Sequence, residues 1–345
     1  MFDFTALPIL ANLGIFTLAG AAVWFAGTRL AGYADELAQL TGLGSALAGM
    51  ILLAGITSLP EFAVSVSAGF SGAAQLAVNS LLGSIALQVV VLSIGDWVLG
   101  GRALSFVIGK PEVLLQGIFG AVLLAFVCGA IAAGDHAFLG AGVWSLGLVV
   151  GSFLLLWFVA HANQSERSGW VPQDMPDLGD VTGEEKPPDT LSRAITMTAI
   201  MAAIILVAGF LLARTDDALA TQSGLGTSFI GVTLVGLATS LPEISTLVAA
   251  VRLKRYSMAF GDIFGTNILN VALIWLIDLA YPGGPVLNDV GAFSQVAASL
   301  GMVLTLLDVA GLVERRNETL GRLGLDSWAV IVTYLSGITV LFFMR

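Results

Sequence analysis

The chain has 345 residues, of which 57% are hydrophobic and 11% are charged, and its mean hydropathy is +0.93. This composition leaves too little polar surface for a water-soluble fold of that size, so it indicates an integral protein of the lipid bilayer. The formal net charge of −10 gives no support to a nucleic-acid partner, because nucleic-acid-binding surfaces carry an excess of Lys and Arg.

Five apolar runs in the first part of the chain are each long enough to cross a bilayer as a helix, which takes roughly 20 residues. They lie at about residues 8–30, 46–70, 76–99, 114–133 and 138–160. We therefore expect residues 1–162 to form a first unit of five transmembrane helices.

Residues 163–190 differ in composition from the apolar runs. They contain seven acidic residues against two basic ones, together with four prolines. Because such a segment buries little apolar surface, it is expected to be a flexible linker.

The second part of the chain repeats the count of the first. Its apolar runs lie at about residues 191–213, 229–251, 258–281, 290–313 and 327–343. Residues 191–345 are therefore expected to form a second five-helix unit, which makes the chain an all-α polytopic membrane protein with ten transmembrane helices.

The two units share a repeated motif. The pentapeptide Thr-Ser-Leu-Pro-Glu occurs at residues 57–61 and again at 239–243, and at the same offset of 239 − 57 = 182 residues about 43–96 aligns with about 225–278 without a gap. This is the pattern of an internal repeat. Since each unit has an odd number of helices, the two repeats must cross the membrane in opposite senses, as in many secondary transporters.

The basic residues of the connections predict the orientation. If the amino and carboxyl termini are outside, twelve of the fourteen Lys and Arg residues lie on the linker side, and only Arg214 and Arg345 lie outside. Basic connecting segments stay on the cytoplasmic side during insertion. We therefore expect a multi-pass protein of the cytoplasmic (inner) membrane with a cytoplasmic linker.

The chemistry of the repeated motif points to cations. Pro60 and Pro242 interrupt helical hydrogen bonding, so the second and seventh helices should break near the middle of the bilayer. Glu61 and Glu243 would then meet the hydroxyl groups of the two motifs. All of these are hard oxygen donors, which suit calcium, sodium or protons.

The third and eighth helices add a second set of polar side chains. Ser84 and Gln88 are four residues apart and share one helix face, and Thr266 and Asn270 match them at the repeat offset. Asp262 in the eighth helix corresponds to Ser80 in the third, so only one repeat carries this extra acid.

Together, the doubled pentapeptide and the following helices resemble the two alpha repeats of the calcium/cation antiporter superfamily, particularly the sodium/calcium exchangers. The resemblance implies an antiporter that works by alternating access, with the first and sixth helices sliding against the rest. It implies transported calcium and sodium, or protons, and no cofactor. The implied cation ligands are Glu61, Glu243, Thr57, Ser58, Thr239, Ser240, Ser84, Gln88, Thr266 and Asn270. Asp262, which stands where the family often has Asn, is the eleventh candidate ligand.

Several alternatives stay open at this point. Two carboxylates are neutralised equally well by one calcium ion, two sodium ions or two protons, so a calcium/proton exchanger uses the same glutamates; three sodium ions would require Asp262. A passive cation channel would also need oxygen-lined sites. A membrane aspartyl protease is disfavoured, because Ala259 replaces the first glycine of its Gly-x-Gly-Asp signature and the chain has no Tyr-Asp pair.

Three further acids have less certain roles. Asp96 and Asp278 are repeat mates near the ends of the third and eighth helices, where either capping or a role in ion access would fit. Asp308 has no mate and is expected to be a packing or interfacial carboxyl. The oligomeric state does not follow from the sequence.

Overall fold

The computed structural model describes residues 4–70, 72, 74–108, 110–138, 140–162, 190–222 and 240–344. Helices dominate it, as the sequence predicted. In the first part they are η1 (Phe4–Ala6), α1 (Ile9–Thr41), α2 (Ser45–Ala48), η2 (Gly49–Leu53), α3 (Ala54–Thr57), α4 (Leu59–Phe70), α5 (Ala74–Leu99), α6 (Pro111–Ala133) and α7 (Val143–Ala162). In the second part they are α8 (Leu191–Gln222), α10 (Leu241–Arg252), α11 (Tyr256–Ala280), η3 (Val286–Asn288), α12 (Ala292–Glu314) and α13 (Leu325–Met344).

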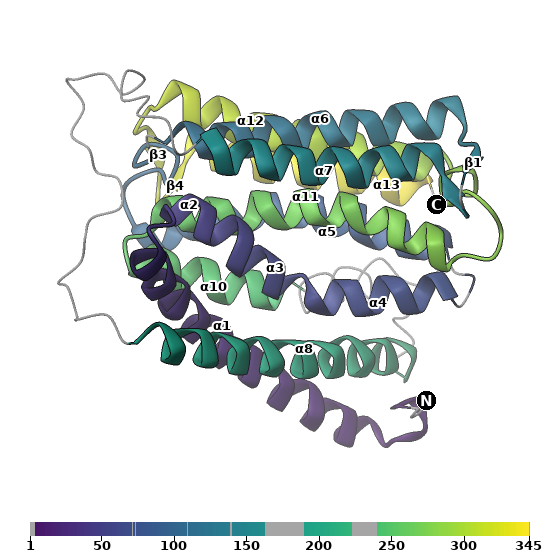
Figure 1. Cartoon of the computed structure of the whole chain (residues 1–345), viewed down its shortest axis with the longest axis horizontal. Helices are drawn as coiled ribbons and strands as arrows, with labels where there is room; N and C mark the ends of the chain where they lie inside the picture. The colour runs from purple at the N-terminus through teal and green to yellow at the C-terminus, as the bar shows by residue number, and fades with distance from the viewer. Residues whose placement is uncertain are drawn as a thin grey trace.

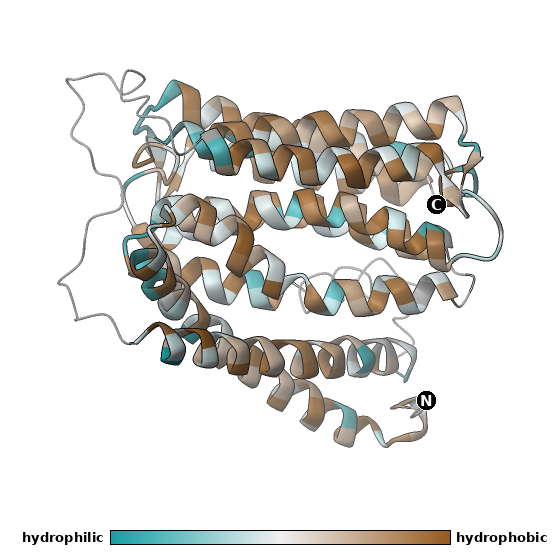
Figure 2. Cartoon of the chain, viewed as in Figure 1, coloured by the Kyte–Doolittle hydropathy of each residue, from teal (hydrophilic) through white to brown (hydrophobic). Residues whose placement is uncertain are grey.

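Within the described residues, eight helices are long and apolar enough to cross a membrane, and a bent pair formed by Ser45–Thr57 and Leu59–Ser67 makes a ninth. Hydrophobic residues run along the whole length of these helices (Figure 2). The chain is therefore an all-helical, multi-pass membrane protein. Of the seventh predicted helix, only the part from Ser240 onwards is described, and the predicted linker at 163–190 lies outside the described residues except for Thr190.

The helices lie side by side along the long axis of the molecule (Figure 1). We call the end where α7 finishes and α8 starts the linker end; α1 begins and α13 finishes at the opposite end. The helices α11 and α5 are the most enclosed. In an 18-residue apolar stretch of each helix, 72% and 67% of the residues are buried, against 17–50% in the other single-helix spans. Most of their polar side chains are therefore shielded from lipid.

The second predicted span is broken where the proline was expected to break it. The chain bends by 42° at Ser58, between α3 and α4. Just before the bend, η2 has π-helical turns, which are rare and occur mostly at functional sites. This part of the span crosses α11 at backbone contact, since a Cβ atom placed on Gly265 would lie 2.8 Å from the Cα atom of Met50. Because glycine has no side chain, Gly265 permits this close approach of the two helices.

Two short hairpins, which the sequence had not predicted, connect the helices. The strands β1 (Ala137–Phe138) and β2 (Ala141–Gly142) precede α7, and β3 (Thr319–Leu320) and β4 (Leu323–Gly324) precede α13. The predicted fifth helix consequently begins at Val143 and not at residue 138. The residues of the second hairpin lie 182 positions after those of the first, so the hairpins belong to the same repeat as the pentapeptides.

Each hairpin is bound by an aspartate from the other part of the chain. Asp96 at the end of α5 accepts hydrogen bonds from the N–H groups of Leu104 and Gly324, both at 2.6 Å. Asp278 at the end of α11 accepts them from Val286 at 2.7 Å and Gly142 at 2.6 Å. Of the two roles considered for these acids, this geometry matches capping.

These aspartates also reveal the direction of the central helices. Because Asp96 binds β4 and Asp278 binds β2, and the two hairpins lie at opposite ends of the molecule (Figure 1), α5 and α11 run in opposite directions. We refer to the two arrangements as the Asp96 clamp and the Asp278 clamp.

Candidate cation site

The candidate site lies where the break before α4 and the start of α10 meet the central helices α5 and α11. Ten of the eleven predicted ligands are described, and all ten are buried. Thr239, the eleventh, lies outside the described residues.

The two motif glutamates occupy equivalent positions. Glu61 lies in the first turn of α4 and Glu243 in the first turn of α10, where the partial positive charge of a helix N-terminus favours a carboxylate. Glu61 is 6% exposed and Glu243 is fully buried. By distance and angle, none of their four carboxylate oxygens has a hydrogen-bond partner among the described protein groups, although the Thr57 hydroxyl group lies close enough to Glu243 to interact with its carboxylate. A buried carboxylate in that condition must be neutralised by a cation or a proton.

The acidic groups of the site act on one another. Glu243 interacts electrostatically with both Glu61 and Asp262. Two motifs that are 182 residues apart in sequence therefore bring their carboxylates into one electrostatic unit, and Asp262 adds a third acid to it.

Thr57 connects the first motif to α11. Its hydroxyl group lies 3.4 Å from Asp262 Oδ1 and 3.4 Å from the hydroxyl group of Thr266. Ser58 Oγ instead donates to the carbonyl of Ala54 at 2.7 Å, which leaves its lone pairs available. Of the remaining motif hydroxyl groups that are described, Ser240 Oγ is buried and has no partner among the described groups.

Asp262 differs from the two glutamates because protein donors already occupy its carboxylate. Thr57 donates to one oxygen and Thr246 donates to the other. Thr246 was not among the predicted residues, although the sequence contained a signal: it follows Glu243 by three residues, so both lie on one face of α10.

The amide groups of the central helices also meet. Asn270 Nδ2 lies 3.5 Å from Gln88 Oε1, and these two residues are repeat mates, 182 positions apart. Their contact joins α5 to α11. Ser84, the predicted neighbour of Gln88, is likewise buried.

Other buried polar groups were missed by the sequence reasoning. The amide groups of Gln116 on α6 and Asn267 on α11 are buried, and none of their side-chain nitrogen and oxygen atoms has a described partner. Asp308 is buried in α12 and interacts electrostatically with Asp326 and Asp96. For Gln116 and Asn267, the available signal was a polar residue inside a predicted span, whereas Asp308 had been named from the sequence as a packing or interfacial carboxyl.

The donors available in the candidate site are carboxylate, hydroxyl and amide oxygens. Within the described part of the chain, no three His, Cys, Asp or Glu side chains are grouped closely enough to hold a metal ion. The site combines two unpartnered carboxylates with hydroxyl and amide oxygens, which suit hard cations.

Comparison with known proteins gives a consistent result. The family model described as sodium/calcium exchanger protein matches residues 11–163 and 193–343. The chain is 28% identical to the inner membrane protein YrbG of Escherichia coli over 330 residues, which cover 92% of this chain and 95% of that protein. It is 30% identical to the sodium/calcium exchanger MaX1 of Methanosarcina acetivorans over 122 residues, 35% of this chain and 33% of that one.

A solved structure supports the fold. The sodium-calcium exchanger NCX_Mj, soaked with Na⁺ and Sr²⁺, superposes with a TM-score of 0.69 at 19% sequence identity, covering 96% of this chain and 99% of that chain. This likeness concerns the arrangement of the helices, and the site described above rests on the residues of this chain.

Proposed function

Since the chain belongs to the sodium/calcium exchanger protein family, and is a membrane cation antiporter on that ground, we propose that it exchanges calcium for sodium by alternating access. The calcium/proton exchanger is the alternative that uses the same carboxylates. The family is one of transporters, and we extend this to propose that the chain catalyses no chemical reaction.

One observation carries the proposal. Glu61 and Glu243 are both buried and interact electrostatically with each other, and by distance and angle none of their four carboxylate oxygens has a hydrogen-bond partner among the described protein groups. Permanent burial of two such charges is very unfavourable unless cations compensate them. One divalent ion or two monovalent ions compensate the two negative charges equally, so the two kinds of ion compete for the same binding site.

We propose that the remaining predicted ligands complete this binding site. Ser58, Ser240, Ser84 and Thr266 would supply hydroxyl oxygens, and Gln88 and Asn270 would supply amide oxygens. Thr57 and Thr239 occupy equivalent positions in the two motifs. Asp262 would act on the site through the hydroxyl groups of Thr57 and Thr246, which donate to its two carboxylate oxygens.

The exchange cycle follows from charge compensation. In alternating access the site is open first to one side of the membrane and then to the other. The protein can change between these two states only when bound cations neutralise the site, because a charged site in a low-dielectric interior is strongly disfavoured. If Asp262 stays neutral or fully hydrogen-bonded, one calcium ion exchanges for two sodium ions and no net charge moves. Current recordings in a planar bilayer that show net charge movement in each cycle would contradict this stoichiometry.

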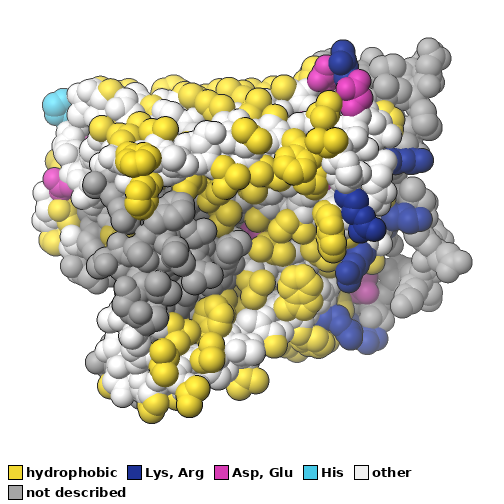
Figure 3. Space-filling view, turned by 180° about the vertical axis from the view of Figure 1, so that it is seen from behind, with side chains coloured by type: hydrophobic (Ala, Val, Ile, Leu, Met, Phe, Trp, Pro, Cys, Tyr) yellow, Lys and Arg dark blue, Asp and Glu magenta, His cyan; other side chains and the backbone are white. Residues whose placement is uncertain are grey.

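We also propose the orientation and the domain division. Lys and Arg side chains gather at the linker end (Figure 3), where the connections after α10 and α12 contain Lys254, Arg255, Arg315 and Arg316. Such an excess marks the cytoplasmic side. Accordingly, residues 1–162 and 191–345 would be the two repeats, residues 163–190 a cytoplasmic linker, and both termini would face outside the cytoplasmic membrane.

Calcium uptake into proteoliposomes tests the function. We expect uptake to be driven by an outward sodium gradient and to be unaffected by a pH gradient imposed alone. Uptake that follows only the pH gradient would replace sodium by protons in the proposal. Uptake that persists without any ion on the opposite side would indicate a channel, because exchange requires saturable counter-flow.

A further inference from the structure

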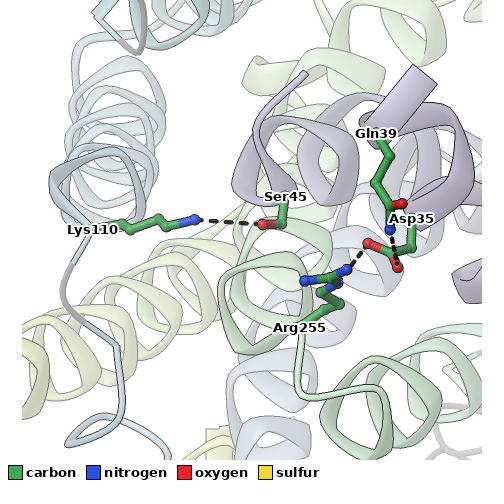
Figure 4. Close-up of polar contacts among 5 residues, drawn as sticks. All are labelled: Asp35, Gln39, Ser45, Lys110 and Arg255. Carbon is green, nitrogen blue, oxygen red and sulfur yellow. Dashed lines mark hydrogen bonds and ion pairs between the residues drawn. The ribbon is translucent and has the colours of Figure 1, made fainter. Parts of the chain in front are cut away.

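An ion pair joins the first helix to the two helices that carry the second half of the candidate site. Arg255 Nε lies 2.6 Å from Asp35 Oδ1, and the two side chains are only 10% and 16% exposed. Asp35 belongs to α1, and Gln39 one turn later donates to its second oxygen at 3.1 Å (Figure 4). By contrast, Arg316 forms local ion pairs with Glu314 and Glu318, and all three of these side chains are more than half exposed.

The backbone around Arg255 is well held. Arg255 lies in the short turn between α10, which carries Glu243, and α11, which carries Asp262 and Thr266. Its N–H donates to the carbonyl of Ala250 at 2.8 Å, and its own carbonyl accepts from Met258 at 3.1 Å. A force on the Arg255 side chain therefore acts on the turn that joins the two site helices.

The contact between α1 and α10 continues from this turn to the level of the site. A Cβ atom placed on Gly27 of α1 would lie 3.0 Å from Ser245 Cβ and 3.3 Å from the carbonyl oxygen of Pro242. Gly27 and Asp35 are eight residues apart, which is about 12 Å along a helix. The ion pair thus closes the linker end of a seam whose other end lies beside the proline of the second motif.

The sequence does not repeat this pair of charges at the offset of 182 residues. At the repeat offset Asp35 corresponds to Asp217, but Arg255 corresponds to Ala73. At that end α8 contacts α4 through Arg214 Nη2 and Ser67 Oγ at 3.2 Å, whose repeat mates are Gly32 and Ala249. In an inverted repeat the two open states are exchanged by the pseudo-symmetry. An interaction that only one repeat contains therefore stabilises one state more than the other.

We propose that Asp35 and Arg255 form a latch that keeps the seam between α1 and α10 closed at the linker end, and that the latch must open in each transport cycle. The inference rests on the proposed exchange, because it presupposes that the site opens alternately to the two sides. It assigns a role in gating to two residues that do not contact the ion.

Thiol labelling tests the latch without measuring transport. Ala250→Cys, in a Cys128→Ser background, places a thiol at a fully buried position of α10 next to Arg255. A charged methanethiosulfonate reagent is added at the linker side of the purified full-length protein in liposomes. We expect Asp35→Asn to increase the labelling rate about tenfold, as for a shift of about 1.4 kcal/mol in the closed-to-open equilibrium.

Two further variants complete the design. The charge-swapped pair Asp35→Arg/Arg255→Asp should return labelling to near the parent rate, and Glu314→Gln, which breaks an exposed ion pair at the same end, should leave it unchanged. Unaltered labelling in Asp35→Asn, or a swapped pair no closer to the parent than the single variant, would overturn the latch. So would single variants that fail to fold, as judged by gel filtration, while the swapped pair folds, because the pair would then be a structural support.

The outcomes for the latch and for the exchange are distinguishable. If sodium does not drive calcium uptake but labelling depends on the charges as expected, the proposed exchange is wrong and the gating contact stands. If uptake behaves as proposed and labelling ignores the pair, only the latch is wrong.

Discussion

The two repeats of this chain agree at the ends of the central helices and differ beside the candidate site. The Asp96 and Asp278 clamps use corresponding acceptors and corresponding N–H donors, at nearly equal distances. Beside the site, Asp262 and Thr246 of the second repeat correspond to Ser80 and Val64 of the first.

The contrast separates two kinds of requirement. In a scaffold built from two inverted repeats, the supporting contacts occur in matched pairs, one in each repeat. A site that distinguishes ions, or favours one of its two open states, needs features that only one repeat contains. Substitutions at matched positions can test this division.

The largest effect is expected at the motif glutamates, which are symmetric in both sequence and position. Glu61→Gln and Glu243→Gln each remove one of the two charges that we propose to bind calcium, and each should lower sodium-driven calcium uptake by at least about a hundredfold, or about 2.7 kcal/mol. Uptake into proteoliposomes, normalised to the amount of folded protein, is the measurement. Wild-type uptake in either variant would refute the assignment of that residue.

The second-largest effect is expected at the Asp96 and Asp278 clamps, and the loss in the free energy of unfolding should be equal in the two variants. Asp96→Asn and Asp278→Asn each turn an amide N–H₂ group toward one of two backbone donors, at a cost of about 2–3 kcal/mol in the free energy of unfolding. Thermal unfolding in detergent measures the loss, with the exposed Glu318→Gln as a control. A large loss for one variant and none for the other would show that the clamps are not equivalent.

The glycines that face the motif prolines should distinguish the repeats more finely. Gly27 and Gly209 are repeat mates, and a Cβ atom on Gly209 would lie 2.5 Å from Cγ of the rigid Pro60 ring, whereas on Gly27 it would meet the rotatable Ser245 side chain. Overpacking typically costs about 1–3 kcal/mol. We expect Gly209→Ala to slow exchange more than Gly27→Ala, as measured by initial uptake rates; the reverse order would contradict this packing argument.

The smallest effect is expected where the repeats differ. Asp262→Asn removes a carboxylate that interacts electrostatically with Glu243, and it replaces one of the two oxygens that accept from Thr57 and Thr246 by an N–H₂ group. It should therefore lower sodium-driven uptake about tenfold, or about 1.4 kcal/mol. Ser80→Ala, at the matched position, should change uptake by less than about twofold. Similar losses in both variants would show that the third acid has no special part in the site.

Much of this structure could be predicted because the bilayer constrains it. Apolar runs of spanning length gave most of the helices, and Pro60 gave the position of the bend at Ser58, since proline cannot donate the helical hydrogen bond. The repeat offset connected Gln88 to Asn270 before any contact between them was known.

The remainder depends on contacts between distant parts of the chain. Two-residue strands have no periodicity to detect, so the hairpins were read as the beginning of a helix or as a loop. Asp96 could be recognised as a buried acid, but its partner Gly324 is 228 residues away and donates only a backbone N–H, which every residue but proline has. Likewise, neither Asp35 nor Arg255 has a local pattern that indicates the other.

The clamps have a consequence for assembly. Each repeat supplies an aspartate whose second N–H donor belongs to the other repeat, so a single repeat would insert with a buried acid facing an empty position. Two polypeptides produced by cutting the gene within residues 163–190 should therefore associate in the membrane and be stable only together. Each would be expected to be degraded when expressed alone.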